Sequence, residues 1–426
     1  MQEENGTRAL SESPGEPSTT PSPPPSRPAW KRHLFPWTLL LIGAGLRLAW
    51  PLDFEWKGDE QWSFDTAQRT ARGEREIPSI GMPSSVGLSN PGVSTWPFVG
   101  LAYISRTPEG MTLGVMLINA VWLLGLALWV RFTWDEEDQG WGYWAIALFA
   151  VSPLPLLFSR KLWPPDVFPL FLLPWLWAHA RRDRAVFAFL WGLIGMLMGQ
   201  LHLSGFFAAA GLAGGSWISS RKNVHWVAWV WGSVVGVFFM FPWMWHELHA
   251  GWSPGSGRTL NVDFLLLAWQ TAWGLDLEYS LGTDTLTFLA GPSVAGRSTW
   301  LLYGIQTALL VLSIYAAIVL WVERRSLVFP TRLRPLLWGV LIGGGLLQIV
   351  CVQVNLYYLI VWSPVFHIMA AWMLSRRPRW LAVTAVLQLC LSVAFLSYIH
   401  KNGGARGGDY GVTYRVQQEK STQADQ

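Results

Sequence analysis

A series of long apolar runs, which begins after Lys31-Arg32 and continues almost to residue 400, most constrains what this chain can fold into. Each run is near the roughly 20 residues that an α-helix needs to cross a bilayer. Helices satisfy their own backbone hydrogen bonds, so they are the form that such isolated runs adopt in lipid. The runs predict an all-α, polytopic transmembrane bundle of about eleven spans. We place the spans at 34–51, 110–132, 141–158, 167–180, 184–201, 203–219, 226–245, 299–321, 335–353, 355–374 and 380–399.

The composition agrees with a membrane protein. Charged residues make up 14% of the 426 residues and hydrophobic residues 51%, whereas ordinary soluble chains are about 25% charged. The chain also holds 30 tryptophans, and the amphipathic indole ring favours the membrane interface. These values exclude a soluble enzyme, a fibrous protein and a disordered chain. The basic residues recur in short clusters between the apolar runs and form no single stripe, so we expect no nucleic-acid partner.

The basic clusters also predict the orientation. With the N-terminus inside, the clusters at 181–184, 221–222, 323–334 and 376–379 all fall on the cytosolic side, as the positive-inside rule requires. The loop 133–140 is acidic, but acidic residues carry little weight in this rule. We therefore expect a multi-pass protein of the inner (cytoplasmic) membrane with a cytosolic N-terminus.

The same reasoning divides the chain. Residues 1–33 are rich in Pro, Ser and Glu, which predicts a disordered cytosolic tail and not a cleavable signal. Residues 34–399 form the transmembrane domain, and 400–426 a short outer polar tail. The outer segments of this topology are 52–109, 159–166 and 246–298, and they hold the polar residues that packing does not explain.

The first outer segment carries two adjacent carboxylates. Gly58 marks a turn, and Asp59 and Glu60 open a helix that the pattern predicts over 60–73, lying on the membrane surface. One interpretation is a helix cap with a solvated neighbour. The other is a catalytic pair, in which mutual repulsion and partial burial raise at least one pKa toward neutrality.

A resemblance to a known family favours the catalytic interpretation. An apolar first span with Arg47 near its end, the 58–60 motif and an Asn90-Pro91 step resemble the opening of the GT-C membrane glycosyltransferases. The nearest branches are the protein O-mannosyltransferases and the lipid A aminoarabinose transferases (glycosyltransferase family 39-like). The segment from Ser159-Arg160 to Asp166 is similar to a second outer loop of that family. The motifs cover about the first 200 residues, and the remainder resembles the family by topology alone.

Two departures accompany the resemblance. Gln61 and Trp62 stand where the family often has a residue that meets the donor phosphate, and the short segment after residue 400 replaces a larger outer C-terminal part. Phosphate contact must then come from elsewhere, and we expect no C-terminal domain that handles the acceptor.

The resemblance implies an inverting glycosyltransferase that moves a sugar from a polyprenyl-phosphate donor to a hydroxyl or amine on the outer face. The acceptor is a glycan, a lipid or a protein. Asp59 is the expected base, and Glu60 its partner or orienter. Two alternatives stay open: a transporter or flippase for lipid-linked saccharides, and an O-antigen ligase or polymerase whose essential residues lie in 246–298.

The remaining candidate residues support that chemistry. Arg160 and Lys161 are the expected donor-phosphate ligands, with Arg47 as a minor candidate, although each also suits an interfacial residue whose charge reaches the headgroups. Asp166 and His202 are supporting candidates, with a cap and an interfacial hydrogen bond as the respective alternatives. Contacts to the sugar or lipid are expected from Trp56 and Trp62. No cofactor is required, and a divalent metal, if one binds, would be held by Asp59, Glu60 and Asp166.

Overall fold

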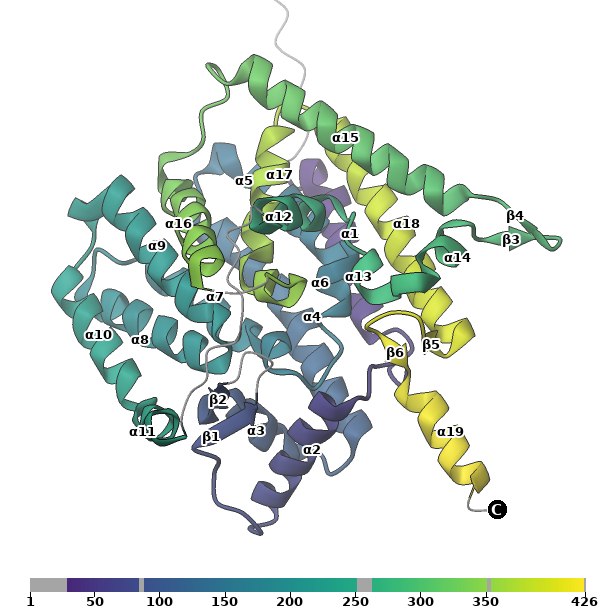
Figure 1. Ribbon diagram of the computed structural model, residues 1–426. Coiled ribbons are helices and arrows are strands. Elements are labelled where there is room, and N and C mark those ends of the chain that lie inside the picture. The colour runs from purple at the N-terminus through teal and green to yellow at the C-terminus, as the bar shows by residue number, and fades with distance from the viewer. Residues whose placement is uncertain (1–28, 84–87, 251–262, 351–353, 425–426) are drawn as a thin grey trace, which may run out of the picture.

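The computed structural model describes residues 29–83, 88–250, 263–350 and 354–424 as a bundle of helices with three small hairpins (Figure 1). The helices of the first half are α1 (Ala29–Leu48), α2 (Gly58–Ala71), α3 (Trp96–Ile104), α4 (Pro108–Thr133), α5 (Glu136–Val151), α6 (Pro153–Leu157), α7 (Pro169–Ala180), α8 (Ala185–Leu201), α9 (Ser204–Ser220) and α10 (Trp226–Phe238). Those of the second half are α11 (Phe241–His249), α12 (Asp263–Trp273), α13 (Glu278–Leu281), α14 (Thr285–Leu289), α15 (Leu301–Glu323), α16 (Arg334–Val350), α17 (Ser363–Met373), α18 (Pro378–Asn402) and α19 (Tyr414–Ala424).

Short elements connect the helices. The antiparallel hairpins are β1 (Ile80–Pro83) with β2 (Ser89–Pro91), β3 (Ser293–Val294) with β4 (Arg297–Ser298), and β5 (Gly404–Ala405) with β6 (Gly411–Val412). The 3₁₀ turns are η1 (Gly92–Ser94), η2 (Pro164–Val167), η3 (Arg221–Asn223), η4 (Gly282–Asp284), η5 (Thr331–Leu333) and η6 (Leu356–Trp362). The all-α character that the apolar runs predict is therefore observed.

Every predicted span contains a helix, but fewer helices are long enough to cross a membrane alone. Within the described ranges, five qualify by length and hydropathy, or six if α10 and α11, bent by 56°, form one span. The predicted span 141–158 is divided between α5 and α6, because Ser152 precedes Pro153 and is held extended (ψ 138°). The chain is thus a multi-pass helical membrane protein, and the count of about eleven stays a prediction.

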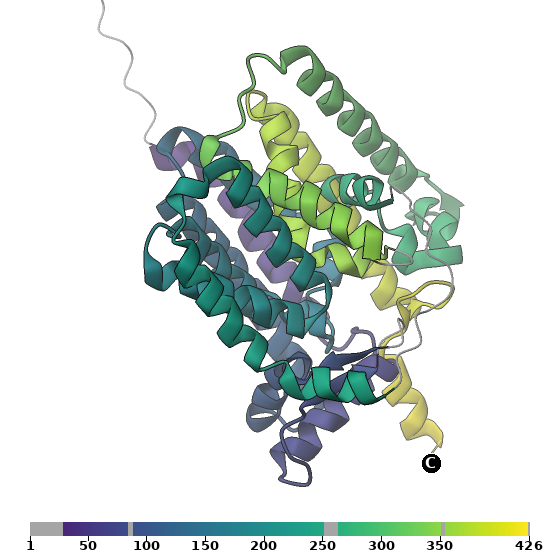
Figure 2. The ribbon, with the colours of Figure 1, turned by 60° about the vertical axis from the view of Figure 1, so that its left-hand side comes forward.

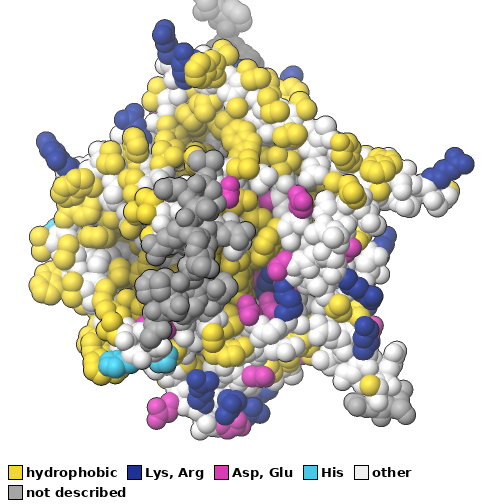
Figure 3. Space-filling model, viewed as in Figure 1, with side chains coloured by type: hydrophobic (Ala, Val, Ile, Leu, Met, Phe, Trp, Pro, Cys, Tyr) yellow, Lys and Arg dark blue, Asp and Glu magenta, His cyan; other side chains and the backbone are white. Residues whose placement is uncertain are grey.

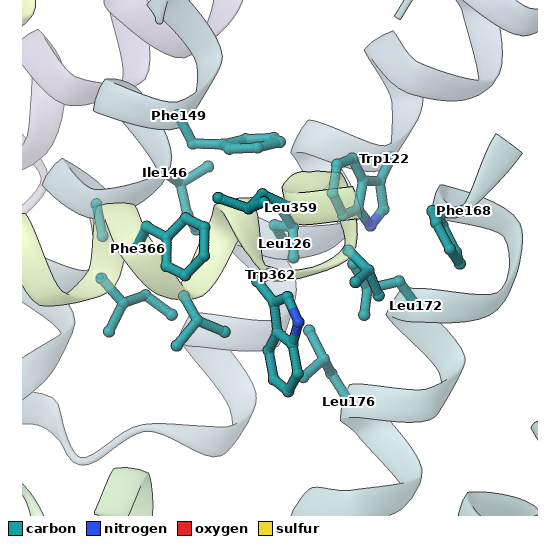
Figure 4. Packing of buried hydrophobic residues seen from close by; sticks show 14 of the residues in the cluster. Trp122, Leu126, Ile146, Phe149, Phe168, Leu172, Leu176, Leu359, Trp362 and Phe366 are labelled. Carbon is teal, nitrogen blue, oxygen red and sulfur yellow. The ribbon is translucent and has the colours of Figure 1, made fainter. Parts of the chain in front are cut away.

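Close helix contacts depend on glycine. A Cβ atom added to Gly211 of α9 would lie 2.3 Å from the carbonyl oxygen of Gly339 in α16, so only glycine permits this approach. At the centre of the bundle, Trp122 and Leu126 of α4 meet Phe149 of α5 and Trp362 of η6 (Figure 4). The bundle therefore has a close-packed core that holds its ends in place.

Two segments differ from the predicted topology. The segment 246–298 is not a loop throughout, because α12 packs against α17 and buries Phe264 and Trp273. The segment 400–426 is more than a polar tail: Gly403 ends α18 with a φ of 67°, and β5–β6 and α19 then fold back toward α2. Figure 2 shows α2, α11 and α19 at the end of the bundle opposite to residue 29. The predicted N-terminal tail lies outside the described residues up to residue 28.

The surface matches this arrangement. On the face drawn in Figure 3, hydrophobic side chains cover most of the upper part, and acidic side chains lie in the centre and lower part, toward the end that holds α2. Exposed apolar side chains suit contact with lipid, and the polar end is where a cavity opens.

Candidate functional site

A cavity of about 280 Å³ lies at the end of the bundle that holds α2. Segments far apart in the sequence meet there: the start of α2, the β1–β2 hairpin, the loop 159–166, the α8–α9 junction, η6 and the β5–β6 hairpin. The lining residues are Glu55, Lys57, Asp59, Glu60, Met82, Pro83, Asn90, Lys161, Trp163, Pro164, His202, Leu203, Tyr279, Tyr357, Tyr358 and Asp409. The two sequence motifs at 58–60 and 159–166 therefore line one cavity.

The start of α2 places the carboxylate pair. Lys57 is the extended N-cap residue, and its backbone N–H donates to Oε2 of Glu60 at 3.0 Å in a capping box. Glu60 is buried by this contact, whereas Asp59 stays exposed in the first turn, where a carboxylate is favoured by the helix dipole. Glu60 thus fills the cap role that the sequence left open, and Asp59 is the carboxylate that faces the opening.

Glu55, which the sequence analysis did not single out, is the centre of the charge network. Its side chain is 1% exposed, and its oxygens lie 2.9 Å from Nζ of Lys57 and 2.6 Å from Nζ of Lys161. Burying one charge is costly, and two ammonium groups offset that cost here. Burial alone would lower the pKa of Lys161, but attraction to Glu55, Asp166 and Glu60 raises it above its usual range. Lys161 is therefore charged and held by Glu55.

The pKa of Glu60 responds to the same network. Burial, followed by the negative charge of Glu55, raises the pKa of Glu60, and the charges of Lys161 and Lys57 oppose this increase only in part. The expectation that a neighbouring carboxylate and burial would raise the pKa of one member of the pair thus applies to Glu60. The neighbouring carboxylate that raises this pKa is that of Glu55 and not that of Asp59.

The guanidinium groups of the two predicted arginines lie outside this cavity, so the structure does not bring them together with the carboxylates there. The guanidinium of Arg160 is buried and donates to the carbonyl oxygens of Leu46, Arg47 and Trp50, where α1 ends. The guanidinium of Arg47 donates to Gly43 and to Ala150 of α5. Both guanidinium groups are therefore engaged by backbone carbonyl oxygens of α1, of the turn that follows it and of α5. Neither side chain lines the cavity.

Asp166 lies behind the wall and does not line the cavity. Its Oδ2 accepts from the backbone N–H of Lys161 at 3.0 Å, and its own carbonyl accepts from Nδ2 of Asn119 at 2.8 Å. Burial raises the pKa of Asp166 well above its usual range, with Lys161 opposing and Glu55 and Glu60 adding to the increase. Asp166 therefore shapes the turn that presents Lys161, and it does not cap the following helix, because α7 has Phe168 as its N-cap and no side-chain cap hydrogen bond.

The aromatic lining also differs from the prediction. Trp56 packs against Phe54, Phe64 and Tyr414 and does not line the cavity, and neither does Trp62. Their expected place is taken by Trp163, whose ring centroid lies 5.0 Å from that of Tyr357. Trp56 packs instead against the buried cluster of Phe54, Met116 and Tyr414.

His202 does line the cavity. Its Nδ1 lies 2.8 Å from Oγ of Ser204, and its ring contacts Tyr358 with centroids 5.6 Å apart. Burial lowers the pKa of His202 to about 4. A neutral imidazole in this position can orient a ligand by hydrogen bonding, and it does not supply positive charge at neutral pH.

The C-terminal hairpin closes one side of the cavity. Asp409 lines it, and its backbone carbonyl accepts from the ammonium of Lys57. Nearby, Nε of Arg415 donates to Oδ1 of Asp53 at 2.8 Å. The backbones of Glu55 and Thr413 form an isolated antiparallel β-bridge. The alternation of Asp53, Glu55 and Lys57 along an extended segment was the sequence signal for this network, because every second residue shares a face.

Of the three residues expected to hold a metal ion if one binds, Asp59 and Glu60 line the cavity and Asp166 does not. Four carboxylates and two lysines line it, and Glu55 is held by the lysines. In the part of the chain that the structure describes, no three His, Cys, Asp or Glu side chains come close enough together to hold a metal ion. The arrangement can instead accept a proton at Asp59 and offer positive charge at Lys57, whose side chain is 38% exposed.

Comparisons with known proteins find likeness at the level of solved structures. No family model and no curated protein sequence matches the chain. A crystal structure of ArnT from Cupriavidus metallidurans bound to undecaprenyl phosphate shares 14% identity at a TM-score of 0.44, covering 88% of this chain and 63% of that one. The Archaeoglobus fulgidus oligosaccharyltransferase in the apo form shares 14% identity at a TM-score of 0.43, covering 87% and 55%.

A third structure, the oligosaccharyltransferase AglB from Archaeoglobus fulgidus with an inhibitory peptide and a dolichol-phosphate, has 14% identity and a TM-score of 0.42, covering 92% and 56%. This chain therefore spans less than two thirds of the length of each of the three. Because the TM-scores are below 0.5, function has to be argued from the cavity itself.

Proposed function

We propose that this chain is an integral-membrane inverting glycosyltransferase that moves a sugar from a polyprenyl-phosphate donor to a hydroxyl or amine acceptor. The observation that carries the proposal is that Asp59 of the 58–60 motif and Lys161 of the 159–166 loop line one cavity of about 280 Å³. That cavity lies at one end of a membrane bundle, where a lipid-linked donor presents its head group. Under the predicted orientation this is the outer face of the cytoplasmic membrane.

Asp59 is the proposed base. Its exposed carboxylate takes the proton from the acceptor as the acceptor oxygen or nitrogen forms a bond to the anomeric carbon. The bond from that carbon to the phosphate oxygen breaks on the opposite face, and the lipid phosphate leaves with the electron pair. One displacement of this kind inverts the anomeric centre. Glu60, held by the N-terminus of α2, keeps Asp59 in place.

Lys57 is the proposed phosphate contact, in place of Arg160 and Arg47. The ammonium groups of Lys57 and Lys161 both pair with Glu55. That of Lys57 also lies 3.4 Å from Oδ2 of Asp409, but the side chain of Lys57 is 38% exposed whereas that of Lys161 is 4% exposed. Burial tends to lower the pKa of Lys57, but Glu55, Asp409 and Glu60 together raise it. A permanently charged, partly exposed ammonium can stabilise the charge that develops on the departing phosphate.

The aromatic wall is the proposed sugar contact. Trp163 and Tyr357 present their rings to the cavity, and His202 and Tyr358 lie beside them. Flat aromatic rings suit the apolar faces of sugars, and the nearby hydroxyl and imidazole groups suit their hydroxyls. The acceptor, which is a glycan, a lipid or a protein, would approach the side where Asp59 is exposed.

The test is transfer by membranes that contain the full chain, with labelled polyprenyl-phosphate sugars as donors. Asp59→Asn removes the proton acceptor and is expected to reduce turnover at least a hundredfold, the lower range for general-base catalysis. Asp65→Asn changes an exposed carboxylate of the same helix outside the cavity, and it should keep wild-type turnover. Full activity of Asp59→Asn at a normal protein level would sink the assignment.

The same variants separate the alternatives. A transporter of lipid-linked saccharides would move the labelled donor across the bilayer with no product, and Asp59→Asn would leave that movement intact. A ligase or polymerase whose essential residues lie in 246–298 would tolerate Asp59→Asn but lose activity in Tyr279→Phe, the residue of that segment that lines the cavity.

A further inference from the structure

A second, larger cavity lies at the opposite end of the bundle. It encloses about 580 Å³ between the C-terminal ends of α4 and α7, the η3 turn and the start of α16. The helix α7 begins directly after the loop that carries Lys161 and Asp166, and it ends at this second cavity. Its 12 residues span about 18 Å, so the two cavities are separate sites.

One wall of the second cavity is basic. Arg181, Arg182, Lys222 and Arg332 line it, with Asp183 as the single carboxylate among the lining residues. The first cavity, in contrast, is lined by four carboxylates and two lysines. The second cavity therefore favours an anion, and its guanidinium groups match the paired oxygens of a phosphate.

Arg182 is held in position by the protein. Its Nη1 donates to the carbonyl of His179 at 2.8 Å and its Nη2 to Oγ of Ser220 at 2.9 Å, which joins the ends of α7 and α9. Arg181 lies over the ring of Trp177, 4.7 Å from its centroid. Burial lowers the pKa of Arg182 to about 10, so it is still charged at neutral pH. The charges are thus arranged before any ligand arrives, which reduces the entropy lost on binding.

The other wall is apolar. Trp129, Phe132, Leu333 and Leu336 line it, and Phe132 is largely exposed on the outside of the bundle. A free inorganic anion has no apolar surface to bury against such a wall. An amphiphile, which has a charged head and an apolar chain, fits both walls at once, and basic pockets between membrane helices suit anionic head groups.

We infer that this second cavity binds the phosphate head group of an anionic lipid, with Arg181 and Lys222 contacting the phosphate and the lipid chain leaving past Phe132. Arg332 takes part less, because it is exposed and pairs with Asp135 at 3.0 Å. The phosphate belongs either to a bilayer phospholipid or to a polyprenyl phosphate, which share this chemistry. The cavity binds such a lipid whether or not the first cavity transfers sugar.

The experiment titrates the purified full chain in non-ionic detergent and measures the bound fraction by native mass spectrometry. Phosphatidylglycerol, undecaprenyl phosphate and the zwitterionic phosphatidylcholine are added separately. The double variant Arg181→Gln/Lys222→Gln should weaken binding of the anionic lipid by roughly tenfold or more, since each lost charged contact contributes on the order of 1 kcal/mol. Asp183→Asn should strengthen it, because this variant removes the one carboxylate among the lining residues.

The matched control is Arg325→Gln/Arg379→Gln. It removes two exposed basic residues from the same end of the bundle, outside the cavity, and should leave binding unchanged. The lipid whose binding depends on Arg181 and Lys222 identifies the source of the phosphate. Equal losses in both double variants, equal binding of phosphatidylcholine, or displacement by inorganic phosphate at the same concentration would each overturn the proposal.

Discussion

The carboxylate of Glu55 and the ammonium of Lys161 lie 2.6 Å apart, and both side chains are almost fully buried. This pair joins the segment before α2 to the loop before α7, and so holds the two motifs on one cavity. Removing Lys161 leaves the buried carboxylate of Glu55 paired with Lys57 alone of its two lysines, whereas removing Glu55 and Lys161 together leaves neither buried charge. The pair therefore makes a specific stability prediction.

Lys161→Met should lower the free energy of unfolding by about 3 kcal/mol, the lower end of the usual range when one member of a buried ion pair is lost, because Lys57 still pairs with Glu55. The double variant Glu55→Gln/Lys161→Met should recover part of that loss. Thermal unfolding of the detergent-solubilised chain measures both. Arg72→Gln breaks an exposed pair with Glu74 and should change stability by less than about 1 kcal/mol; a loss equal to that of Lys161→Met would contradict the prediction.

Stability should depend on pH through Glu60. Its pKa is raised above the ordinary 4.5, so between these values the folded chain binds more protons than the unfolded chain. Stability then falls as pH rises from about 4.5 through the raised pKa. In Glu60→Gln, which keeps the capping box, this part of the fall should disappear. Thermal unfolding against pH measures it, and Glu76→Gln, an exposed carboxylate, should follow the wild-type curve.

Substitution of Arg160 should lower the free energy of unfolding, whereas substitution of Lys57 should change the kinetics with the donor. Arg160→Met removes the buried guanidinium and its three hydrogen bonds to carbonyl oxygens around the end of α1, at a cost of about 3 kcal/mol. The KM of its folded fraction for the donor should stay at the wild-type value. Lys57→Met should instead raise the donor KM or lower kcat. If the KM for the donor rose in Arg160→Met and not in Lys57→Met, the phosphate ligand would be Arg160 and not Lys57.

Variants of Trp163 and Trp62 test which tryptophan contacts the sugar. Trp163→Ala removes a ring from the cavity wall and should raise the KM for the sugar donor about three- to tenfold. Trp62→Ala changes α2 outside the cavity and should not. Steady-state transfer kinetics measure both KM values. A larger increase in KM for Trp62→Ala than for Trp163→Ala would indicate that Trp62 of α2 contacts the sugar.

The C-terminal hairpin should be required for an intact cavity. Arg415→Gln removes a donor from the buried carboxylate of Asp53 and should loosen the segment after residue 403. Limited proteolysis should then cut this segment faster, and transfer should fall with it. Lys420→Gln, an exposed residue farther along α19, is the control, and equal cleavage of both variants would argue against the contact with Asp53.

The long apolar helices and the membrane class could be predicted from the sequence, because they depend on local patterns, whereas α12 and α19 lie in segments that were expected to be a loop and a polar tail. A run of apolar residues defines a helix in lipid wherever it lies. The start of α2 was also predictable, since capping depends on residues three apart. The division at Ser152 and Pro153 follows the same local rule, although the hydropathy pattern concealed it.

The residues that surround the carboxylates of Asp59 and Glu60 could not be predicted from local patterns. The sequence by itself determined that Asp59 and Glu60 open a helix, and that Arg160 and Lys161 lie in a polar loop. Only the tertiary structure decided that Lys161 faces the cavity, that Arg160 turns to the end of α1, and that Glu55 and Asp409 complete the lining. The physical reason is that ion pairs and burial depend on segments distant in the chain, which meet only when the bundle packs.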